Sequence, residues 1–220
     1  MNKLALRGII LAVVITLSCF SFAASAQSAS LTTLFKADTG ISAGGGIYFD
    51  LENVGYAPII ITSWYVNVNP GTNDVKVWYR TGTSQGFEQT KTVWQLLGTE
   101  AGVVSLGVDR RTPVNVGGLT IAPGEVFGIA MAGGMSWMYT GGTGSNQIYN
   151  DGALEIRTGS ANGSPFSAGL VYTPRVWNGT IYYTQGEPIP TLSEWGLIIL
   201  SLLLAGTGYF TIRRRRGACS

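Results

Sequence analysis

One serine of this chain stands in a pattern that hydrolases use. Gly82-Thr83-Ser84-Gln85-Gly86 fits G-x-S-x-G, in which a histidine takes the proton of the serine. The 220 residues include no histidine, which excludes Ser-His-Asp and Cys-His catalysis, histidine-ligated zinc and a histidine pH switch. Ser84 therefore has no base, and we interpret the stretch as a loop after a strand that ends at Arg80.

Carboxylate pairs can hydrolyse glycosidic bonds without histidine. Asp50 and Glu52 would project from one face of a single strand, and three further acids are candidates: Glu100, Asp109 and Glu155. No window of the sequence combines dense acids with dense aromatics, as a glycosidase cleft usually does. Charge on a solvated strand face is therefore the preferred interpretation, and we expect no enzyme. A His-free, carboxylate-dependent glycoside hydrolase is the second alternative function.

Aromatic side chains offer a binding function instead. Trp78 stands between Lys76 and Arg80 on a strand face that is expected to point outward, and three tyrosines have polar neighbours: Tyr48, Tyr65 and Tyr182. Such amphipathic rings suit the face of a sugar ring, although cross-strand packing explains them equally well. A carbohydrate-binding surface module, with an extracellular polysaccharide as partner, is the first alternative function.

Metal and cofactor signals are weak. Asn146, Asn150 and Asp151 could offer oxygen ligands to calcium, but their spacing matches no established loop. The glycine-rich stretches 44–46 and 141–144 are not followed by Gly-Lys-Ser/Thr, so we interpret both as loops. No metal and no cofactor is assigned.

The basic residues are unevenly distributed. Six of the 14 lie near the two ends of the chain, whereas the stretch from Lys36 to Glu187 holds eight basic and eleven acidic side chains, a formal charge of −3. An acidic middle without a basic stripe lacks the features that neutralise phosphates. Nucleic acid is therefore excluded as a partner.

The N-terminus has the three parts of a secretory signal peptide. Lys3 and Arg7 precede an apolar run over residues 8–22, and Ala24-Ser25-Ala26 precede Gln27. We expect signal peptidase to remove residues 1–26, because the apolar run is shorter than the roughly 20 residues of a membrane span. Cys19 raises a lipoprotein alternative, which Thr16 three residues earlier disfavours.

The other end of the chain predicts a transmembrane helix. Residues 195–212 carry no charge, and four arginines follow at once: Arg213, Arg214, Arg215 and Arg216. By the positive-inside rule the arginines stop transfer and stay in the cytoplasm, which leaves the preceding chain on the outer side. We assign no role to Cys219.

A short motif stands just before this helix. Residues 189–196 read IPTLSEWG, and its defining residues are Ile189, Pro190, Thr191, Leu192, Trp195 and Gly196. Motif, hydrophobic helix and basic cluster together resemble an IPTL-CTERM sorting domain, which we place at residues 186–220. This family is similar to the PEP-CTERM system of Gram-negative bacteria. The resemblance implies that a membrane-embedded exosortase processes the tail and passes the protein toward the cell surface.

Residues 27–185 have the pattern of an all-β domain without cysteine. Ile47, Phe49 and Leu51 alternate with polar residues, as a half-buried strand requires. Many such runs with glycine-rich turns predict a two-sheet β-sandwich, for which a jelly roll is one topology. The predicted strands are residues 47–52, 59–68, 75–80, 93–97, 114–121, 125–131, 136–139, 153–158 and 180–184.

These patterns predict a secreted cell-envelope surface protein with a structural or interaction role. The chain would be exported, anchored transiently in the inner membrane by its C-terminal helix, and then released to the cell surface or the extracellular space. Its ectodomain would fold as a monomer without metal or disulfide.

Overall fold

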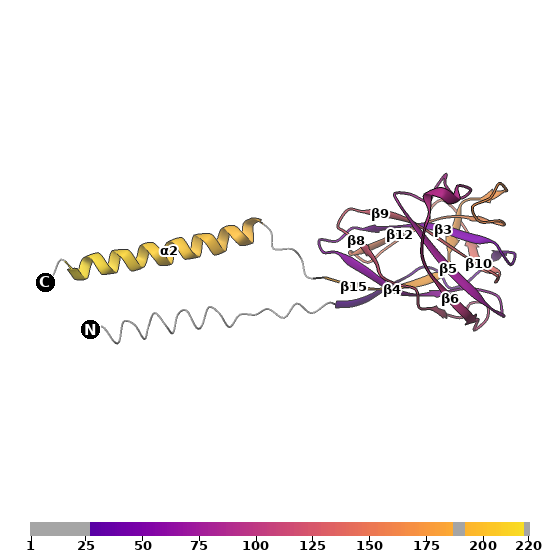
Figure 1. The fold of residues 1–220 in the computed structure, drawn as a ribbon, viewed down its shortest axis with the longest axis horizontal. Coiled ribbons are helices and arrows are strands. Elements are labelled where there is room, and N and C mark those ends of the chain that lie inside the picture. The colour runs from indigo at the N-terminus through magenta and orange to yellow at the C-terminus, as the bar shows by residue number, and fades with distance from the viewer. Residues whose placement is uncertain (1–26, 187–191, 218–220) are drawn as a thin grey trace.

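The computed structural model describes residues 27–186 and 192–217. The predicted signal peptide with Ala24 and Ala26, the motif residues Ile189, Pro190 and Thr191, and both cysteines lie outside these ranges. The all-β prediction is confirmed for residues 27–186, which form antiparallel sheets (Figure 1). The C-terminal segment is helical, as the sequence predicts.

Two large sheets and one small sheet form the β-domain. The five-stranded sheet comprises β1 (Gln27–Thr32), β15 (Gly179–Gln185), β4 (Ile59–Val66) and β7 (Thr112–Val114) in that order, with β8 (Leu119–Ile121) also on β4. The seven-stranded sheet comprises β11 (Ile148–Asn150), β12 (Leu154–Asn162), β3 (Gly46–Asn53), β9 (Val126–Gly133), β5 (Thr72–Thr81) and β6 (Gln95–Val104), with β13 (Val171–Tyr172) beside β12. The small sheet comprises β14 (Arg175–Trp177), β10 (Trp137–Gly141) and β2 (Thr39–Ile41).

The third sheet corrects the two-sheet prediction. Its side chain Trp177 stacks on Phe49 of the seven-stranded sheet, with ring centroids 4.3 Å apart, and meets Trp64 of the five-stranded sheet edge-on at 6.3 Å. These three rings, all fully or nearly fully buried, join the three sheets in one core. Burial of each such side chain contributes roughly 1.5–3 kcal/mol. The sequence could not show the third sheet because its strands are three to five residues long.

The strand pattern of β3 explains its central place. Ile47, Phe49 and Leu51 are buried and face the main core, as their alternation predicts. Tyr48 points to the opposite face, where it was expected to be exposed, but it has no exposed surface. Its prediction as an accessible residue is wrong because loops cover this face of the sheet.

Several strand boundaries differ from the prediction. The expected strand 114–121 is divided into β7 and β8 by Gly117 and Gly118; a side chain on Gly117 would collide with the backbone of Thr62. The expected strand 93–97 begins as a short 3-10 turn, η1 (Lys91–Val93), before β6. The sequence missed five strands that carry little apolar alternation: β1, β2, β11, β13 and β14.

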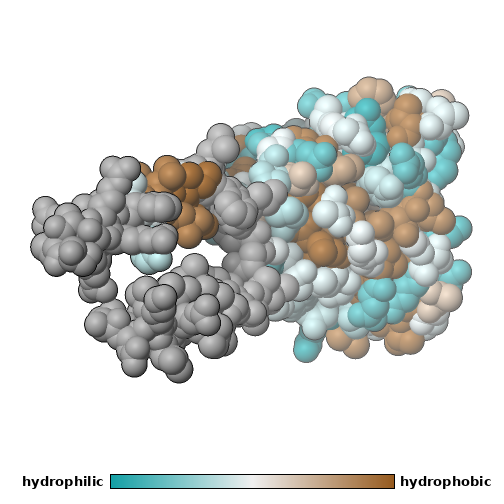
Figure 2. Space-filling model, turned by 60° about the vertical axis from the view of Figure 1, so that its left-hand side comes forward, coloured by the Kyte–Doolittle hydropathy of each residue, from teal (hydrophilic) through white to brown (hydrophobic). Residues whose placement is uncertain are grey.

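The C-terminal helix α2 (Leu192–Gly217) starts three residues before the predicted span and includes all four arginines. Its described apolar side chains are exposed, among them Ile199, Leu203 and Leu204. In Figure 2 a hydrophobic, brown stretch is visible in this part of the molecule. Within residues 27–186 and 192–217, no helix is long and apolar enough to cross a membrane. The predicted transmembrane span is therefore not confirmed.

Candidate ligand-binding groove

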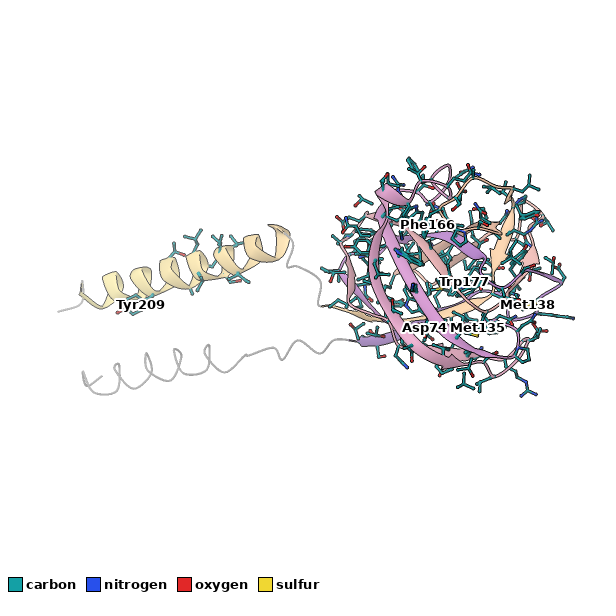
Figure 3. The ribbon with its side chains drawn as sticks, turned by 45° about the vertical axis from the view of Figure 1, so that its right-hand side comes forward. Asp74, Met135, Met138, Phe166, Trp177 and Tyr209 are labelled. Atoms are coloured by element: carbon teal, nitrogen blue, oxygen red, sulfur yellow. The ribbon has the colours of Figure 1, made fainter. Side chains whose placement is uncertain are left out.

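A groove of about 800 Å³ lies on the outer face of the seven-stranded sheet. Because Val75 and Val77 are buried in the core, the intervening Lys76 and the following Trp78 point outward into this groove. We call it the β5 groove and define it by residues of β5, of the turn after β9 and of the loop 165–167. Figure 3 labels Asp74 and Phe166, which line it from β5 and from that loop.

Small residues make the groove concave. Lys76 lies opposite Ala132 of β9, and Ala132 is followed in the chain by Gly133 and Gly134. A side chain on Gly133 would collide with the backbone oxygen of Asp74, and one on Gly134 would collide with the side chain of Asn73. The floor of the groove therefore consists of backbone atoms and the methyl group of Ala132, and the larger side chains lie at its rim.

An aromatic cluster closes one end of the groove. Tyr48, Ala130 and Trp78 lie side by side on β3, β9 and β5, and Phe166 covers them, with its ring 5.0 Å from Trp78 and 6.0 Å from Tyr48. Trp94 packs between Tyr48 and Phe166 at 5.7 and 5.6 Å. These rings form a second small core outside the main one.

Hydrogen bonds hold the covering loops on the sheet. The backbone oxygen of Glu88 accepts from the Tyr48 hydroxyl at 3.0 Å and from the backbone N–H of Phe166 at 2.9 Å. The Glu88 carboxylate is buried and accepts from the Ser160 hydroxyl at 2.9 Å. Burial raises the pKa of Tyr48, so this hydroxyl remains a donor even at a pH near its ordinary pKa of 10.0.

Phe166 occupies a costly backbone conformation. Its φ of 61° lies in the left-handed region, which few non-glycine residues adopt. The hydrogen bond to Glu88 and the ring contacts with Trp78 and Trp94 compensate for this strain. The ring of Phe166 also contacts the Nζ of Lys91.

Lys91 is one of two lysines that line the groove, with Lys76. Its Nζ lies 4.1 Å from the ring centroid of Trp78 and 4.1 Å from that of Phe166, which is the geometry of a double cation–π contact. Partial burial lowers the pKa of Lys91, and the charge of Lys76 lowers it further. Neither lysine forms an ion pair within the described part of the chain.

The remaining polar groups of the groove are largely unused. Among the described residues, no hydrogen-bond partner contacts the side chains of Thr72, Asn73, Lys76 or Ser167. Asp74 differs, because its Oδ1 accepts from the backbone N–H of Gly102 at 2.9 Å. The groove thus presents donors and acceptors to solvent beside aromatic rings.

The groove lies at the end of the seven-stranded sheet that is far from Gln185, the last residue of β15. It surrounds the start of β3 and β5 and the end of β9, where Gly46 pairs with Ala132. The other end of β3, at Asn53, lies close to the end of β15, because the side chains of Asn53 and Gln185 both lie near Gly55. The eight residues of β3 span about 23 Å between these ends.

The four aromatic residues predicted from the sequence do not form one site. Trp78 lines the groove, but it is only half-exposed, and Lys91 and Phe166 cover its ring. Tyr48 is buried beneath the loops. Tyr65 and Tyr182 lie on the five-stranded sheet and pack edge-on against each other at 5.1 Å.

The predicted carboxylates all have local partners. Asp50 accepts from the Ser84 backbone at 2.6 Å and from the Thr83 hydroxyl at 2.5 Å, which holds the G-x-S-x-G stretch in the expected loop after β5. Two others bind side chains or backbone: Glu100 accepts from Asn115, and Asp109 accepts from Ala37 at 2.8 Å and from Asn67 at 2.9 Å. The last two bind Arg157, with Glu52 at 2.5 Å and Glu155 at 2.7 Å.

The two ion pairs of Arg157 change its pKa. Burial opposes the charged form of Arg157, but the charges of Glu155 and Glu52 outweigh this effect and raise the pKa of the guanidinium.

The residues considered for calcium stabilise local structure instead. Asn146 accepts from Thr143, Asn150 accepts from Gly152, and Asp151 accepts from Leu154 and Tyr183. Within the described ranges, no group of three or more acidic or cysteine side chains is placed to hold a metal ion.

Sequence reasoning missed Lys91, Phe166 and Glu88. Phe166 and Tyr48 are 118 residues apart in sequence, and Tyr48 and Glu88 are 40 apart. Phe166 stands in a loop without periodicity, so no local pattern could pair these residues.

The comparisons with known proteins identify the tail. Residues 187–216 match the family model described as the IPTL-CTERM motif, which confirms the resemblance seen in the sequence. The fold and the motif together define an all-β protein that carries an IPTL-CTERM sorting motif. No curated protein matches the chain.

Two solved structures are distantly similar. One is the cysteine protease and lectin-like domains of Cwp84, a surface layer associated protein of Clostridium difficile, at 10% identity, 73% of this chain, 36% of that chain and a TM-score of 0.42. Another is the infectious bursal disease virus Gx strain, at 14% identity, 80% of this chain, 49% of that chain and a TM-score of 0.27. The chain spans less than half of either, and likenesses at these scores carry no argument about fold or function.

Proposed function

We propose that this protein is exported to the cell envelope, sorted by its C-terminal motif, and binds carbohydrate in the β5 groove. The observation that carries the binding proposal is the set of polar side chains without partners in a concave site beside Trp78 and Phe166. Saccharide sites combine such hydrogen-bonding groups with aromatic surfaces. The structural or interaction role predicted for the ectodomain thereby becomes recognition of a glycan.

The sorting proposal follows from the motif at residues 187–216. Signal peptidase would cleave before Gln27, and the apolar residues of α2 would hold the chain in the inner membrane until an exosortase-type enzyme processes the tail. The arginines at the end of α2 would remain cytoplasmic. The protein would then reach the cell surface or the extracellular space.

The groove is well placed for a surface role. Both membrane segments would join the β-domain at one end, while the groove lies at the other end of the seven-stranded sheet. A glycan outside the cell would therefore approach the groove without obstruction by the membrane. We propose no hydrolytic activity, because the candidate carboxylates are bound to neighbouring groups of the protein.

A glycan array probed with the full chain in detergent tests the binding proposal. We expect retention on saccharide spots that Trp78→Ala reduces at least tenfold. Tyr65→Ala is the matched control, because it removes an aromatic ring from the opposite sheet and should leave retention unchanged. A chain that retains no saccharide, or that loses retention with Tyr65→Ala but not with Trp78→Ala, would overturn the proposal.

A further inference from the structure

We infer that the β5 groove selects an anionic saccharide, whose carboxylate would lie between the ammonium groups of Lys76 and Lys91. The inference rests on the proposed carbohydrate-binding function and adds the chemical class of the ligand. The groove contains two lysines and one carboxylate, that of Asp74. Its charge is therefore opposite in sign to the acidic middle of the chain.

Lys91 is held as a charged group and is not a freely moving surface lysine. Trp78 and Phe166 place their rings 4.1 Å from its Nζ, and ring faces attract a cation. The loop that carries Lys91 is anchored through the buried Glu88 to Tyr48 and Phe166. Because the side chain of Lys91 is already held in place, it loses less conformational entropy on ligand binding than a freely moving lysine would.

The two lysines lack a counter-charge of their own. They are close enough for Lys76 to disfavour the charged form of Lys91, and neither pairs with a carboxylate in the described part of the chain. Asp74, the acid of the groove, already accepts from the Gly102 backbone. A ligand carboxylate would relieve the repulsion and form charge-assisted hydrogen bonds with both ammonium groups.

The rest of the groove favours a sugar as the carrier of that charge. The cavity of about 800 Å³ exceeds what a small inorganic anion fills. Thr72, Asn73 and Ser167 offer both donors and acceptors, which suit the hydroxyl groups of a sugar chain. Because Lys91 covers the face of Trp78, charge and hydrogen bonds, more than ring stacking, would determine affinity.

Oligogalacturonate and its fully methyl-esterified form are the matched probes, since they share one sugar chain and differ in charge. With the full chain in detergent, we expect titration calorimetry to show at least tenfold tighter binding of the acid form at low salt. Screening should reduce this preference as ionic strength rises. A sulfated oligosaccharide in a third arm distinguishes carboxylate from general anion recognition; equal binding there would overturn the carboxylate assignment.

Lysine variants test whether Lys76 and Lys91 cause the preference for the acid form. Lys91→Gln and Lys76→Gln should each lower the preference for the acid form at least threefold, and Lys91→Arg should keep most of it. Lys36→Gln is the control for net charge, because Lys36 is exposed outside the groove. Unchanged thermal unfolding midpoints would show that the variants remain folded.

The outcomes separate the two proposals. Equal binding of the acid and ester forms would overturn the anionic preference and leave carbohydrate binding standing. Binding of neither probe, together with an empty glycan array, would overturn both. A loss of preference with Lys36→Gln as large as that with Lys91→Gln would also overturn the inference, because it would assign the effect to overall charge.

Discussion

Gln27 lies directly opposite Gln185 in the antiparallel pair of β1 and β15. The first residue expected after signal-peptide removal and the last residue of the final strand are therefore cross-strand neighbours. Gly186 continues from this strand and donates its N–H to the Pro58 backbone at 2.9 Å. The two segments predicted to be processed thus join the domain at one end of one sheet.

Strand β1 closes the edge of that sheet with few buried groups. Leu31 is its only buried residue. We expect Leu31→Ala to lower the free energy of unfolding by about 2–3 kcal/mol through lost burial and a residual cavity. Ser30→Ala, at the exposed neighbouring position, should change it by less than about 0.5 kcal/mol. Urea unfolding followed by tryptophan fluorescence measures both, and equal effects would contradict the assigned burial.

Two substitutions of Phe166 separate its ring from its backbone. Phe166→Ala and Phe166→Gly both remove the contacts with Trp78, Trp94 and Lys91, but alanine retains the cost of a left-handed conformation, which glycine does not. We therefore expect the glycine variant to be more stable than the alanine variant by about 1 kcal/mol in urea unfolding. An alanine variant as stable as the glycine variant would show that the φ of 61° is not retained.

Alkaline pH should destabilise the fold through two tyrosines. Burial raises the pKa of Tyr48; burial and the hydrogen bond to Asp151 raise that of Tyr183. In the unfolded chain both ionise near the ordinary pKa of 10.0, while the folded protein retains the protons. The unfolded state then binds fewer protons, so the free energy of unfolding falls as the pH rises above about 10.

The variant Tyr48→Phe tests this pH dependence. Each retained proton contributes a slope of at most about 1.4 kcal/mol per pH unit, so removing Tyr48 should make the decline between pH 10 and 12 shallower by up to that amount. Urea unfolding at a series of pH values measures the slope. Parallel curves for Tyr48→Phe and wild type would contradict the role of Tyr48.

The strands and the tail could be predicted because their signals are local. Ile47, Phe49 and Leu51 reveal a strand by alternation alone, and residues 189–196 form a linear motif. The groove could not be predicted in the same way. Lys91 gains its role from contact with Trp78 and Phe166, which belong to two other segments of the chain.

The failure at Tyr48 has the same origin. Alternation correctly places its side chain on the face opposite Phe49, but it carries no information about what covers that face. The cover comes from Glu88 and Phe166, in loops that follow β5 and β12. Period-two patterns therefore predict the direction of a side chain, while its exposure depends on distant segments.

The sorting tail can be tested by removing its parts separately. Pro190-Thr191→Ala-Ala should abolish recognition by the exosortase while leaving α2 intact, so full-length protein should accumulate in the inner membrane.

Deletion of Arg213 to Arg216 should instead remove the positive charge that opposes translocation, so unprocessed protein should appear in the periplasm. Ser193→Ala is the matched control, because position 193 lies between the defining residues of the motif. Immunoblots of fractionated cells, with and without the exosortase, measure all three variants. A wild-type chain that keeps its C-terminus in the inner membrane in both strains would show a permanent anchor and contradict sorting.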